Sequence, residues 1–598
     1  MIKERLGKLR EVMKQEGVQC LVIPTSDYHN SEYVSEYFMA RKYFSGFTGS
    51  AGTLVVAEDQ AALFTDGRYF IQAARELAGS DITLMKMGEP GVPAVKDYIK
   101  EILKKGQKLG FDGRVITAGE GEAYEKLAEA AEGQAVYDRD FCGMAWEGRP
   151  QIAFTPVYQL SEAYSGESCG GKLARLREKM KEKGAEIHYL TTLDDIAWLF
   201  NLRADDVESC PVLLSYAAIT ETESYLFAGE EAFSEEIREY LAKNHIILRP
   251  YDSFYDFVIA REKENKEEKI LVCKNRINYR LLKELPGERL IDSPNPTTRM
   301  KAVKNETEQE NLRKAHLMDG IAVTRFMYWL KKNVGKIPMD EISVAEHLKS
   351  LRAQNPSFIE PSFETISAYG DNGAIIHYSA KKDACSTIQA KGMLMVDSGG
   401  HYYEGTTDIT RTFILGEITE EMRQHFTLVA RAVMRLKSLR FLKGCRGTNL
   451  DLAAREVFWQ QGLDYKHGTG HGVGYLLNVH EGPNSFRYKE LPGSDNDWEF
   501  EEGMVTTDEP GIYIEGSHGI RTENELLCRK GEQNGYGQFM HFEDLTYVPI
   551  DLDGIDPAAM EESEKKTLNA YHKSVYEKLS PYFEGEELEF LKKATREI

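Results

Sequence analysis

The sequence lacks most of the features that mark secreted, membrane-spanning and disulfide-stabilised proteins. Its 8 cysteines are widely spread and form no Cys-x-x-Cys pair, so we expect free thiols in a reducing cytoplasm. No stretch approaches the roughly 18 consecutive apolar residues of a membrane-spanning helix. The first segment, MIKERLGKLREVMKQEG, has no apolar core of the kind found in secretory signals. We therefore expect a cytoplasmic protein with no membrane partner.

Positive charge is also in short supply. The chain has 74 Lys and Arg against 96 Asp and Glu, a formal net charge of −22. A nucleic-acid-binding protein would present a basic face, so nucleic acid is not an expected partner. The acidity suits attraction of a substrate that carries a free α-amino group. A hydrophobic content of 42% and a length of 598 residues are typical of a globular protein with about three to four domains.

The last third of the chain contains five candidate metal-binding side chains, each within a distinctive local sequence. They are Asp397 in MLMVDSGG, Asp408 in GTTDITRT, His471 in HGTGHGVG, Glu509 in TTDEPG and Glu523 in IRTENEL. Four carboxylates and one imidazole suit two hard or borderline divalent cations. Two such cations about 3.5–4 Å apart share carboxylate bridges and activate a water between them. The pattern therefore indicates hydrolytic chemistry.

The local sequences predict how these side chains could meet. Met393 to Val396 reads as a strand ending at Asp397, and residues 406–413 read as a second strand that contains Asp408. Glycines on both sides of His471 favour a strand or loop, and Glu509 precedes a Pro-Gly turn. Residues 519–527, around Glu523, alternate as a strand does. Each motif alone is also compatible with an ordinary turn, strand end or core histidine, whereas all five together favour a metal site.

An internal repeat organises the first half of the chain. LREVMKQEG at residues 9–17 and LREKMKEKG at residues 176–184 each precede an apolar strand. This pattern predicts two related α/β domains, at residues 1–157 and 158–300, with the Gly/Ser-rich residues 165–171 as a linker. A long helix is expected to begin at Lys301 and to open a catalytic domain over residues 301–550. Residues 551–598 are expected to form a helical C-terminal extension.

The five motifs resemble those of the pita-bread metallopeptidases, which include methionine aminopeptidase, prolidase and aminopeptidase P. Longer strings are similar to the Xaa-Pro aminopeptidase (aminopeptidase P) branch in its long three-domain form. These strings are AIIHYS at 374–379, VDSGGHYYEGTTDITRT, HGTGHGVGYLLNVHEGP, TDEPGIYIEGSHGIRTENEL, SGFTGSAGT at 45–53 and TDGRYFIQA at 65–73. The resemblance implies an α/β (α+β) fold. Two creatinase-like N-terminal domains would precede a pita-bread catalytic domain.

The resemblance also implies how the metals are held. Asp397 would chelate one ion, His471 and Glu509 would hold the other, and Asp408 and Glu523 would bridge them. One imidazole among four carboxylates favours Mn²⁺, while Co²⁺, Zn²⁺ and Fe²⁺ remain possible. Glu509 is the expected proton acceptor for the attacking water.

Further residues match the family around the site. The resemblance implies that His377, His467 and His480 line a proline pocket, stabilise the tetrahedral intermediate and relay protons. Arg521 would hold a ligand carboxylate in place. Related members form dimers, so a homodimer is expected. The departures from the family pattern are Thr522, Glu525 and Gly400-His401, all of which lie beside ligands.

The expected activity is hydrolysis of the N-terminal bond of peptides whose second residue is proline. A prolidase, which cleaves only Xaa-Pro dipeptides, is the nearest alternative, and the long chain favours the aminopeptidase. A non-catalytic pita-bread binding module or a metal-free creatinase would lack metal ligands, whereas all five are present in this chain.

Overall fold

The computed structural model describes residues 2–489 and 497–598, which divide into two compact units. Unit 1 comprises residues 1–160 and 167–297. Unit 2 comprises residues 161–166 and 298–598 and contains all five of the expected metal ligands.

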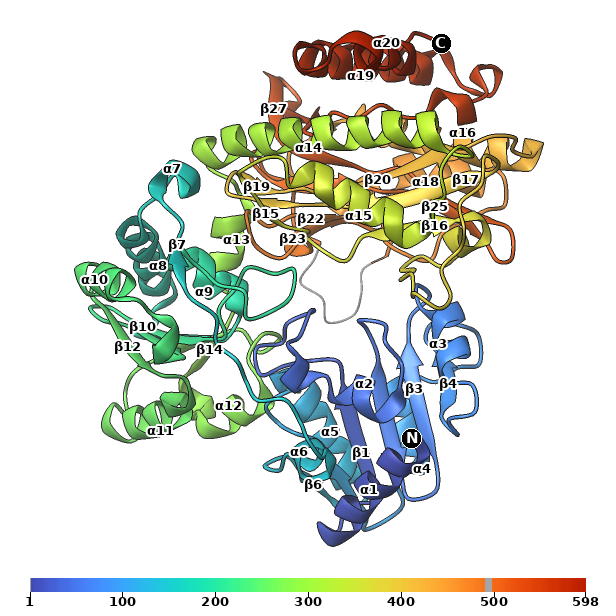
Figure 1. Ribbon diagram of the computed structural model, residues 1–598. Coiled ribbons are helices and arrows are strands. Elements are labelled where there is room, and N and C mark those ends of the chain that lie inside the picture. Colours follow the sequence, from blue (N-terminus) through green and yellow to red (C-terminus); the bar gives the residue numbers. More distant parts are fainter. Residues whose placement is uncertain (1, 490–496) are drawn as a thin grey trace. The chain divides into compact units, whose positions relative to one another are not determined.

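Unit 1 contains two six-stranded sheets that repeat one topology (Figure 1). The first has the order β4 (Thr83–Lys86), β3 (Ala61–Thr65), β2 (Thr53–Ala57), β1 (Cys20–Pro24), β5 (Lys108–Gly110) and β6 (Gln134–Val136). The second has the order β12 (Ile246–Pro250), β11 (Ser224–Ala228), β10 (Tyr216–Thr220), β8 (Ile187–Leu190), β13 (Ile270–Val272) and β14 (Leu290–Asp292). Corresponding neighbours pair in the same sense, antiparallel or parallel, throughout. The prediction of two related α/β domains is confirmed.

The repeated helix explains why the two sequences match. In α1 (Ile2–Gln15) the buried positions include Leu6, Leu9 and Met13. In α8 (Cys169–Lys183) the equivalent positions are Leu173, Leu176 and Met180, and they are buried too. Spacings of three and four residues place these side chains on one face of each helix, so the repeat is a repeat of core packing.

The expected linker at residues 165–171 proved to be two helix ends. Ser165 is the last residue of α7 (Glu162–Ser165), and α8 begins at Cys169. The Ser168 side chain accepts a hydrogen bond from the Gly171 N–H, as a helix-capping serine does. The Ser and Gly content that suggested a linker reflects this capping instead.

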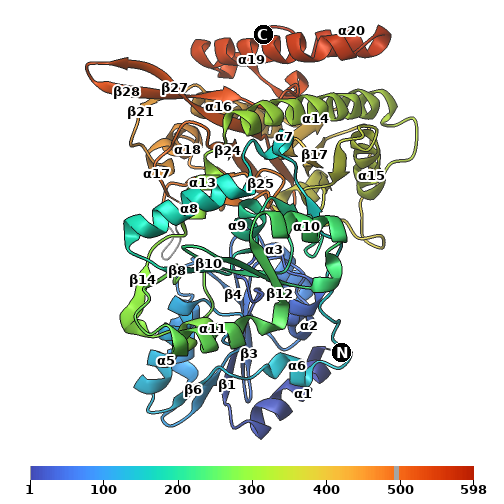
Figure 2. The ribbon, with the colours of Figure 1, turned by 90° about the vertical axis from the view of Figure 1, so that its left-hand side faces the viewer.

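Unit 2 is built from several small sheets. They are β16 (Ile366–Tyr369) with β17 (Met393–Ser398) and β20 (Ile409–Ile414); β15 (Phe358–Glu360) with β18 (His401–Tyr402) and β19 (Gly405–Thr406); β25 (Gly511–Ile514) with β26 (His518–Arg521); and β21 (Arg440–Leu442), β28 (Gly537–Asp544), β27 (Asn524–Asn534), β24 (Val505–Asp508), β22 (Gly470–Gly472) and β23 (Glu481–Phe486). The ends of β27 and β28 extend beyond the other strands as a hairpin (Figure 2).

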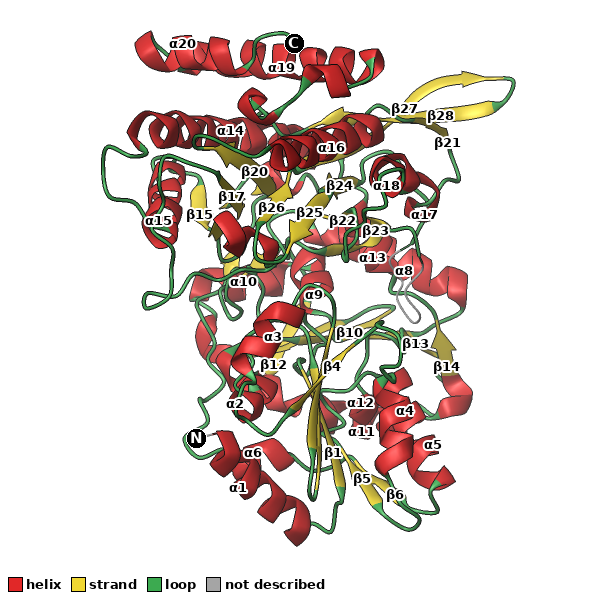
Figure 3. Ribbon diagram, turned by 90° about the vertical axis from the view of Figure 1, so that its right-hand side faces the viewer, coloured by secondary structure: helices red, strands yellow, loops and turns green. Residues whose placement is uncertain are grey.

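Helices cover these sheets on one side. In Figure 3, α14 (Glu306–Asn333) and α16 (Glu420–Lys437) lie along the strands, and α19 (Glu562–Leu579) and α20 (Gly585–Ala594) lie outside them. Val429 and Val433 of α16 and Leu568 of α19 are fully buried in one core with sheet residues such as Leu526. The expected helical C-terminal extension is confirmed. Among the described residues, no helix is both long and apolar enough to cross a bilayer.

The long helix begins at Glu306 rather than at the predicted Lys301. Asn305 accepts a hydrogen bond from the Glu308 N–H, and the Glu308 carboxylate accepts one from the Asn305 N–H. This reciprocal capping box fixes the helix start. Lys301 belongs instead to the short helix α13 (Pro296–Ala302), which opens on a proline, a favourable first helical residue.

Candidate metal centre

The first two expected ligands lie on neighbouring antiparallel strands. Asp397 is within β17 and faces Thr410 of β20 across the ladder. The prediction that Asp408 lies inside a continuous strand over residues 406–413 is wrong. The β18–β19 hairpin ends at Thr406, and β20 begins at Ile409, so Asp408 directly precedes its strand.

The other three ligands lie in or beside short strands. His471 is in the middle of β22, where a β-carbon at Gly470 would overlap the Thr507 carbonyl oxygen. Close approach of backbone at this point therefore requires glycine. Glu509 follows the last residue of β24, and its N–H donates to the Thr469 carbonyl at 2.7 Å. Glu523 lies in the break between β26 and β27, so residues 519–527 are two strands rather than one.

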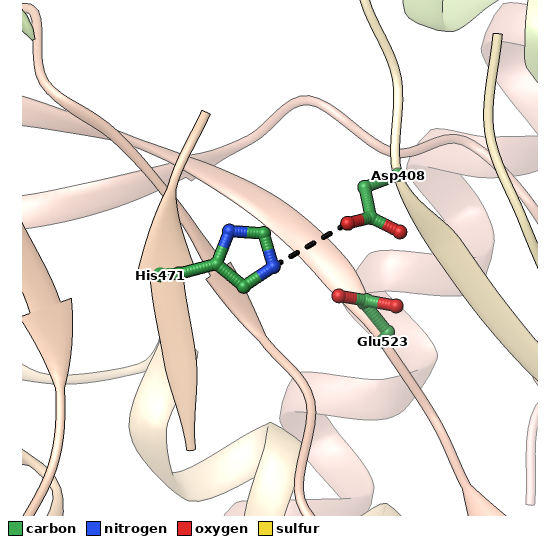
Figure 4. A group of neighbouring side chains, drawn as sticks. All are labelled: Asp408, His471 and Glu523. Carbon is green, nitrogen blue, oxygen red and sulfur yellow. Dashed lines mark ion pairs between the residues drawn. The ribbon is translucent and has the colours of Figure 1, made fainter. Parts of the chain in front are cut away.

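Side chains from these separate elements converge. Asp408, His471 and Glu523 each offer a ligand atom, and these atoms lie within 4.8 Å of one another (Figure 4). His471 Nε2 is 3.4 Å from Asp408 Oδ2 and 3.7 Å from Glu509 Oε1. His471 Nδ1 is 2.9 Å from the Gly472 carbonyl oxygen, which can only accept. In the neutral ring Nδ1 therefore carries the proton, and the Nε2 lone pair faces the carboxylates.

Asp397 is paired with Arg521, the arginine expected to hold a ligand carboxylate. Arg521 Nη2 donates to Asp397 Oδ2 at 2.5 Å, and its Nη1 donates to the Tyr513 hydroxyl at 2.7 Å. Asp397 Oδ1 and Asp408 Oδ1 are buried, and neither has a hydrogen-bond partner among the described residues. Buried carboxylate oxygens left in this state are suited to coordinating cations, so the donor set fits divalent metal ions.

The electrostatics of the site also favour bound cations. Burial raises the pKa of Asp408 well above its ordinary value, and the neighbouring Asp397 carboxylate raises it further. Burial, followed by the Asp408 carboxylate, likewise raises the pKa of Glu523 well above its ordinary value. Burial raises the pKa of Glu509, while His471 opposes that shift. The carboxylates therefore repel one another when ionised, and cations between them would relieve that repulsion.

Of the three further histidines, His480 contacts a ligand directly and His467 is linked to Arg521 through Tyr513. His480 packs edge-on against His471, with ring centroids 4.3 Å apart. His467 Nε2 is 2.8 Å from the hydroxyl of Tyr513, which itself contacts Arg521. Burial lowers the pKa of His467 well below its ordinary value, and Arg521 lowers it further. The half-buried His377 follows η5 (Gly370–Ala374), next to Ile376, whose carbonyl accepts from Arg521 Nη2 at 3.4 Å.

The sequence reasoning missed the contacts of two residues with the ligands and of a third, Tyr513, with the residues around them. Thr410 Oγ1 donates to Glu523 Oε2 at 2.8 Å, and Glu525 Oε1 accepts from the Asp408 N–H at 2.7 Å. Tyr513 links His467 to Arg521. A signal existed for Tyr513, because pairing of β25 with β26 puts Tyr513 and Arg521 on one face. No local pattern indicated the contacts of Thr410 and Glu525.

Known families match almost the entire chain. The family model described as "Metallopeptidase family M24" matches residues 310–530. Models described as "Creatinase/Prolidase N-terminal domain" match residues 5–139 and 148–308. The "C-terminal region of peptidase_M24" matches residues 538–598.

Individual relatives match over most of their length. A protein of Pyricularia oryzae described as "Probable Xaa-Pro aminopeptidase P" is 38% identical over 98% of this chain and 97% of its own. A protein of Pyrenophora teres with the same description is 37% identical over 99% of this chain and 92% of its own. Among solved structures, X-prolyl aminopeptidase from Caenorhabditis elegans, "a cytosolic enzyme with a di-nuclear active site", is 32% identical. It covers 100% of both chains, with a TM-score of 0.96.

Proposed function

Because the chain belongs to metallopeptidase family M24, as an Xaa-Pro aminopeptidase P with a dinuclear metal site, we propose a specific ligand set. Asp397 would hold one ion, His471 and Glu509 would hold the other, and Asp408 and Glu523 would bind both. The observation that carries this assignment is the convergence of Asp408, His471 and Glu523 within 4.8 Å. Only carboxylates offer two oxygens to two cations, which suits Asp408 and Glu523 to bridging.

Mn²⁺ is the proposed metal, because one imidazole among carboxylates suits a hard-to-borderline cation. When bound, two divalent ions lower the pKa of a water held between them and polarise the scissile carbonyl. Glu509 accepts the proton of the attacking water. Arg521 orients Asp397 by the hydrogen bond at 2.5 Å and balances its charge.

His377, His467 and His480 are proposed to contact the substrate rather than the metals. His467 is held by Tyr513 at 2.8 Å, and its lowered pKa keeps the ring neutral near pH 7. A neutral imidazole donates a hydrogen bond from one ring nitrogen and accepts one at the other, which suits His467 to binding and orienting the substrate rather than to supplying a proton. The three rings frame a pocket for a flat proline ring, whose missing N–H needs no acceptor.

The proposed substrates are peptides with proline at the second position, and the proposed assembly is a homodimer in the cytoplasm. The described cysteines are all free, and the C. elegans relative is described as cytosolic, which supports that location. Light scattering on the purified chain tests the dimer. We further propose domain boundaries near residues 157, 300 and 550.

Two measurements test the proposed function. Rates on an Xaa-Pro-Xaa tripeptide and on the matching Xaa-Pro dipeptide, both with Mn²⁺, separate aminopeptidase from prolidase activity. Cleavage of the dipeptide alone would contradict the aminopeptidase assignment. Asp408→Asn and Glu523→Gln should each lower bound metal and reduce kcat by several orders of magnitude. Full metal content and activity in either variant would overturn the ligand set.

A further inference from the structure

A buried carboxylate that is not among the proposed ligands lies against the metal centre. Glu525 is in β27, two residues beyond Glu523, and none of its surface is exposed. A strand buried in this core would ordinarily carry an apolar residue there, as Leu526 and Leu527 do beside it. Burying a carboxylate is unfavourable unless it is hydrogen-bonded or paired, so the contacts of Glu525 indicate its role.

Each oxygen of Glu525 faces a different partner. Oε1 accepts a hydrogen bond from the main-chain N–H of Asp408 at 2.7 Å. Oε2 lies 3.2 Å from Nε2 of His316, a residue of α14 with only 2% of its surface exposed. Oε2 and His316 Nε2 make no hydrogen bond among the described residues, so the bond from the Asp408 N–H is the one that fixes the Glu525 carboxylate.

The contact with Asp408 has a structural reason. Asp408 lies in the break between β19 and β20, so a side chain rather than a strand carbonyl accepts from its N–H. A buried N–H without an acceptor would be costly. The acceptor also ties the Asp408 backbone to β27, the strand that begins directly after Glu523. Thr410 makes the complementary tie, because its hydroxyl donates to Glu523 at 2.8 Å and its carbonyl accepts from the Glu523 N–H at 3.0 Å.

We propose that Glu525 is a positioning residue of the metal centre, with the buried His316 ring lying against its carboxylate. Glu525 holds the backbone of Asp408 so that its carboxylate faces Glu523 and His471. This inference rests on the proposed ligand set, in which Asp408 and Glu523 bridge the ions. Groups that orient metal ligands typically change metal affinity or activity about 10- to 100-fold when they are removed.

The chain offers a matched control at the opposite end of β20. Asp551, 3% exposed, also accepts from a main-chain N–H of β20, that of Ile414, at 2.8 Å. Lys331 lies 2.6 Å from its carboxylate, as His316 lies beside Glu525. Asp551 contacts none of the proposed ligands in the contacts of the described residues. Loss of its carboxylate should therefore disturb stability in a similar way without changing the metal site.

The experiment measures Mn²⁺ affinity by calorimetry on metal-stripped full-length protein, together with thermal stability. Glu525→Leu should weaken Mn²⁺ binding by about 10- to 100-fold, and Asp551→Leu should leave it unchanged. His316→Leu should weaken binding by less than Glu525→Leu, because the contact with Asp408 survives. Equal loss of stability in Glu525→Leu and Asp551→Leu, with normal Mn²⁺ affinity in both, would overturn the inference.

Two conservative variants serve if Glu525→Leu does not fold. Glu525→Gln keeps an oxygen at the same reach and should retain most of the Mn²⁺ affinity. Glu525→Asp keeps the charge but shortens the side chain, and should bind Mn²⁺ more weakly than Glu525→Gln. The reverse order would overturn the inference, because charge rather than reach would then decide. Asp408→Asn separates the two proposals. Normal Mn²⁺ binding in Asp408→Asn refutes the ligand set, whereas weak binding there with normal binding in Glu525→Leu refutes the positioning role alone.

Discussion

Mn²⁺ binding should release protons, and its affinity should rise with pH. Burial and mutual repulsion raise the pKa of Asp408, Glu509 and Glu523 in the metal-free protein. Ligand carboxylates must be ionised to bind a cation, so each proton still held by these groups is displaced when the metal binds. The structure therefore predicts that Mn²⁺ binding releases protons wherever these raised pKa values leave the three carboxylates partly protonated.

The magnitude follows from linkage. Each displaced proton raises the Mn²⁺ affinity about tenfold per pH unit, or about 1.4 kcal/mol. The stability of the metal-free protein should change with pH in the opposite direction to its Mn²⁺ affinity. Its carboxylates have folded-state pKa values above the ordinary 3.8 of Asp and 4.5 of Glu. Their contribution to stability is fully present below those ordinary values and is lost as pH rises through the raised ones. The stability gap between Mn²⁺-bound and metal-free protein should thus widen with pH.

Calorimetry measures both quantities. Mn²⁺ is titrated into metal-stripped protein at one pH in two buffers of different protonation enthalpy, and the difference in heat gives the number of protons released. Thermal unfolding of both forms at several pH values then gives the stability gap. Zero proton release, together with an affinity that stays constant across the titration range of the carboxylates, would refute the argument. It would mean that the crowded carboxylates are already ionised in the metal-free protein.

Three further predictions concern the site. His467→Ala and His480→Ala should lower kcat by about 10²–10³ with metal content unchanged, and loss of metal from either would reassign it as a ligand. Arg521→Met leaves buried Asp397 without its cation and should destabilise the metal-free protein by about 3–5 kcal/mol in urea unfolding; a loss near that of an exposed ion pair, about 0–1 kcal/mol, would contradict the burial argument. Xaa-Pro-Xaa peptides should be cleaved at least about 100-fold better in kcat/KM than Xaa-Ala-Xaa peptides. Alanine fills less of the proline pocket, and its flexible amide must be ordered when the peptide binds. Comparable rates on the two peptides would indicate a broad aminopeptidase.

The internal repeat and the motifs around the metal ligands could be predicted from the sequence because both are local sequence patterns. Leu9 and Leu176 stand at the same helical position in two matching segments, and the structure buries both. Element boundaries were less predictable. The helix expected from Lys301 begins at Glu306, because Asn305 and Glu308 form a capping box that outweighs the apolar pattern.

Contacts made across the fold were not predictable from sequence. Glu525 read as a departure from an apolar strand, since nothing local to it signals the N–H of Asp408 or the ring of His316. The contact of Thr410 with Glu523 likewise joins residues 113 positions apart. Such pairs form only when segments distant in the sequence are brought together, so a polar residue among the apolar residues of a predicted strand is the one sequence signal that Glu525 leaves.

The positions of the two proposed bridging ligands follow a common logic. Asp408 and Glu523 both lie where one strand has ended and the next has not begun. Inside a strand, alternation fixes the direction of every side chain, and a shift that turns one ligand also turns its neighbours. A break frees a single residue from that constraint but leaves its N–H without a regular ladder partner. The N–H of Asp408 donates to the Glu525 carboxylate instead, and the N–H of Glu523 donates to the Thr410 carbonyl. A strand break therefore lets a ligand carboxylate turn toward the metal site and at the same time requires an acceptor for the ligand's N–H from outside the regular ladder. The residues that provide these acceptors position the ligands and are part of the metal centre.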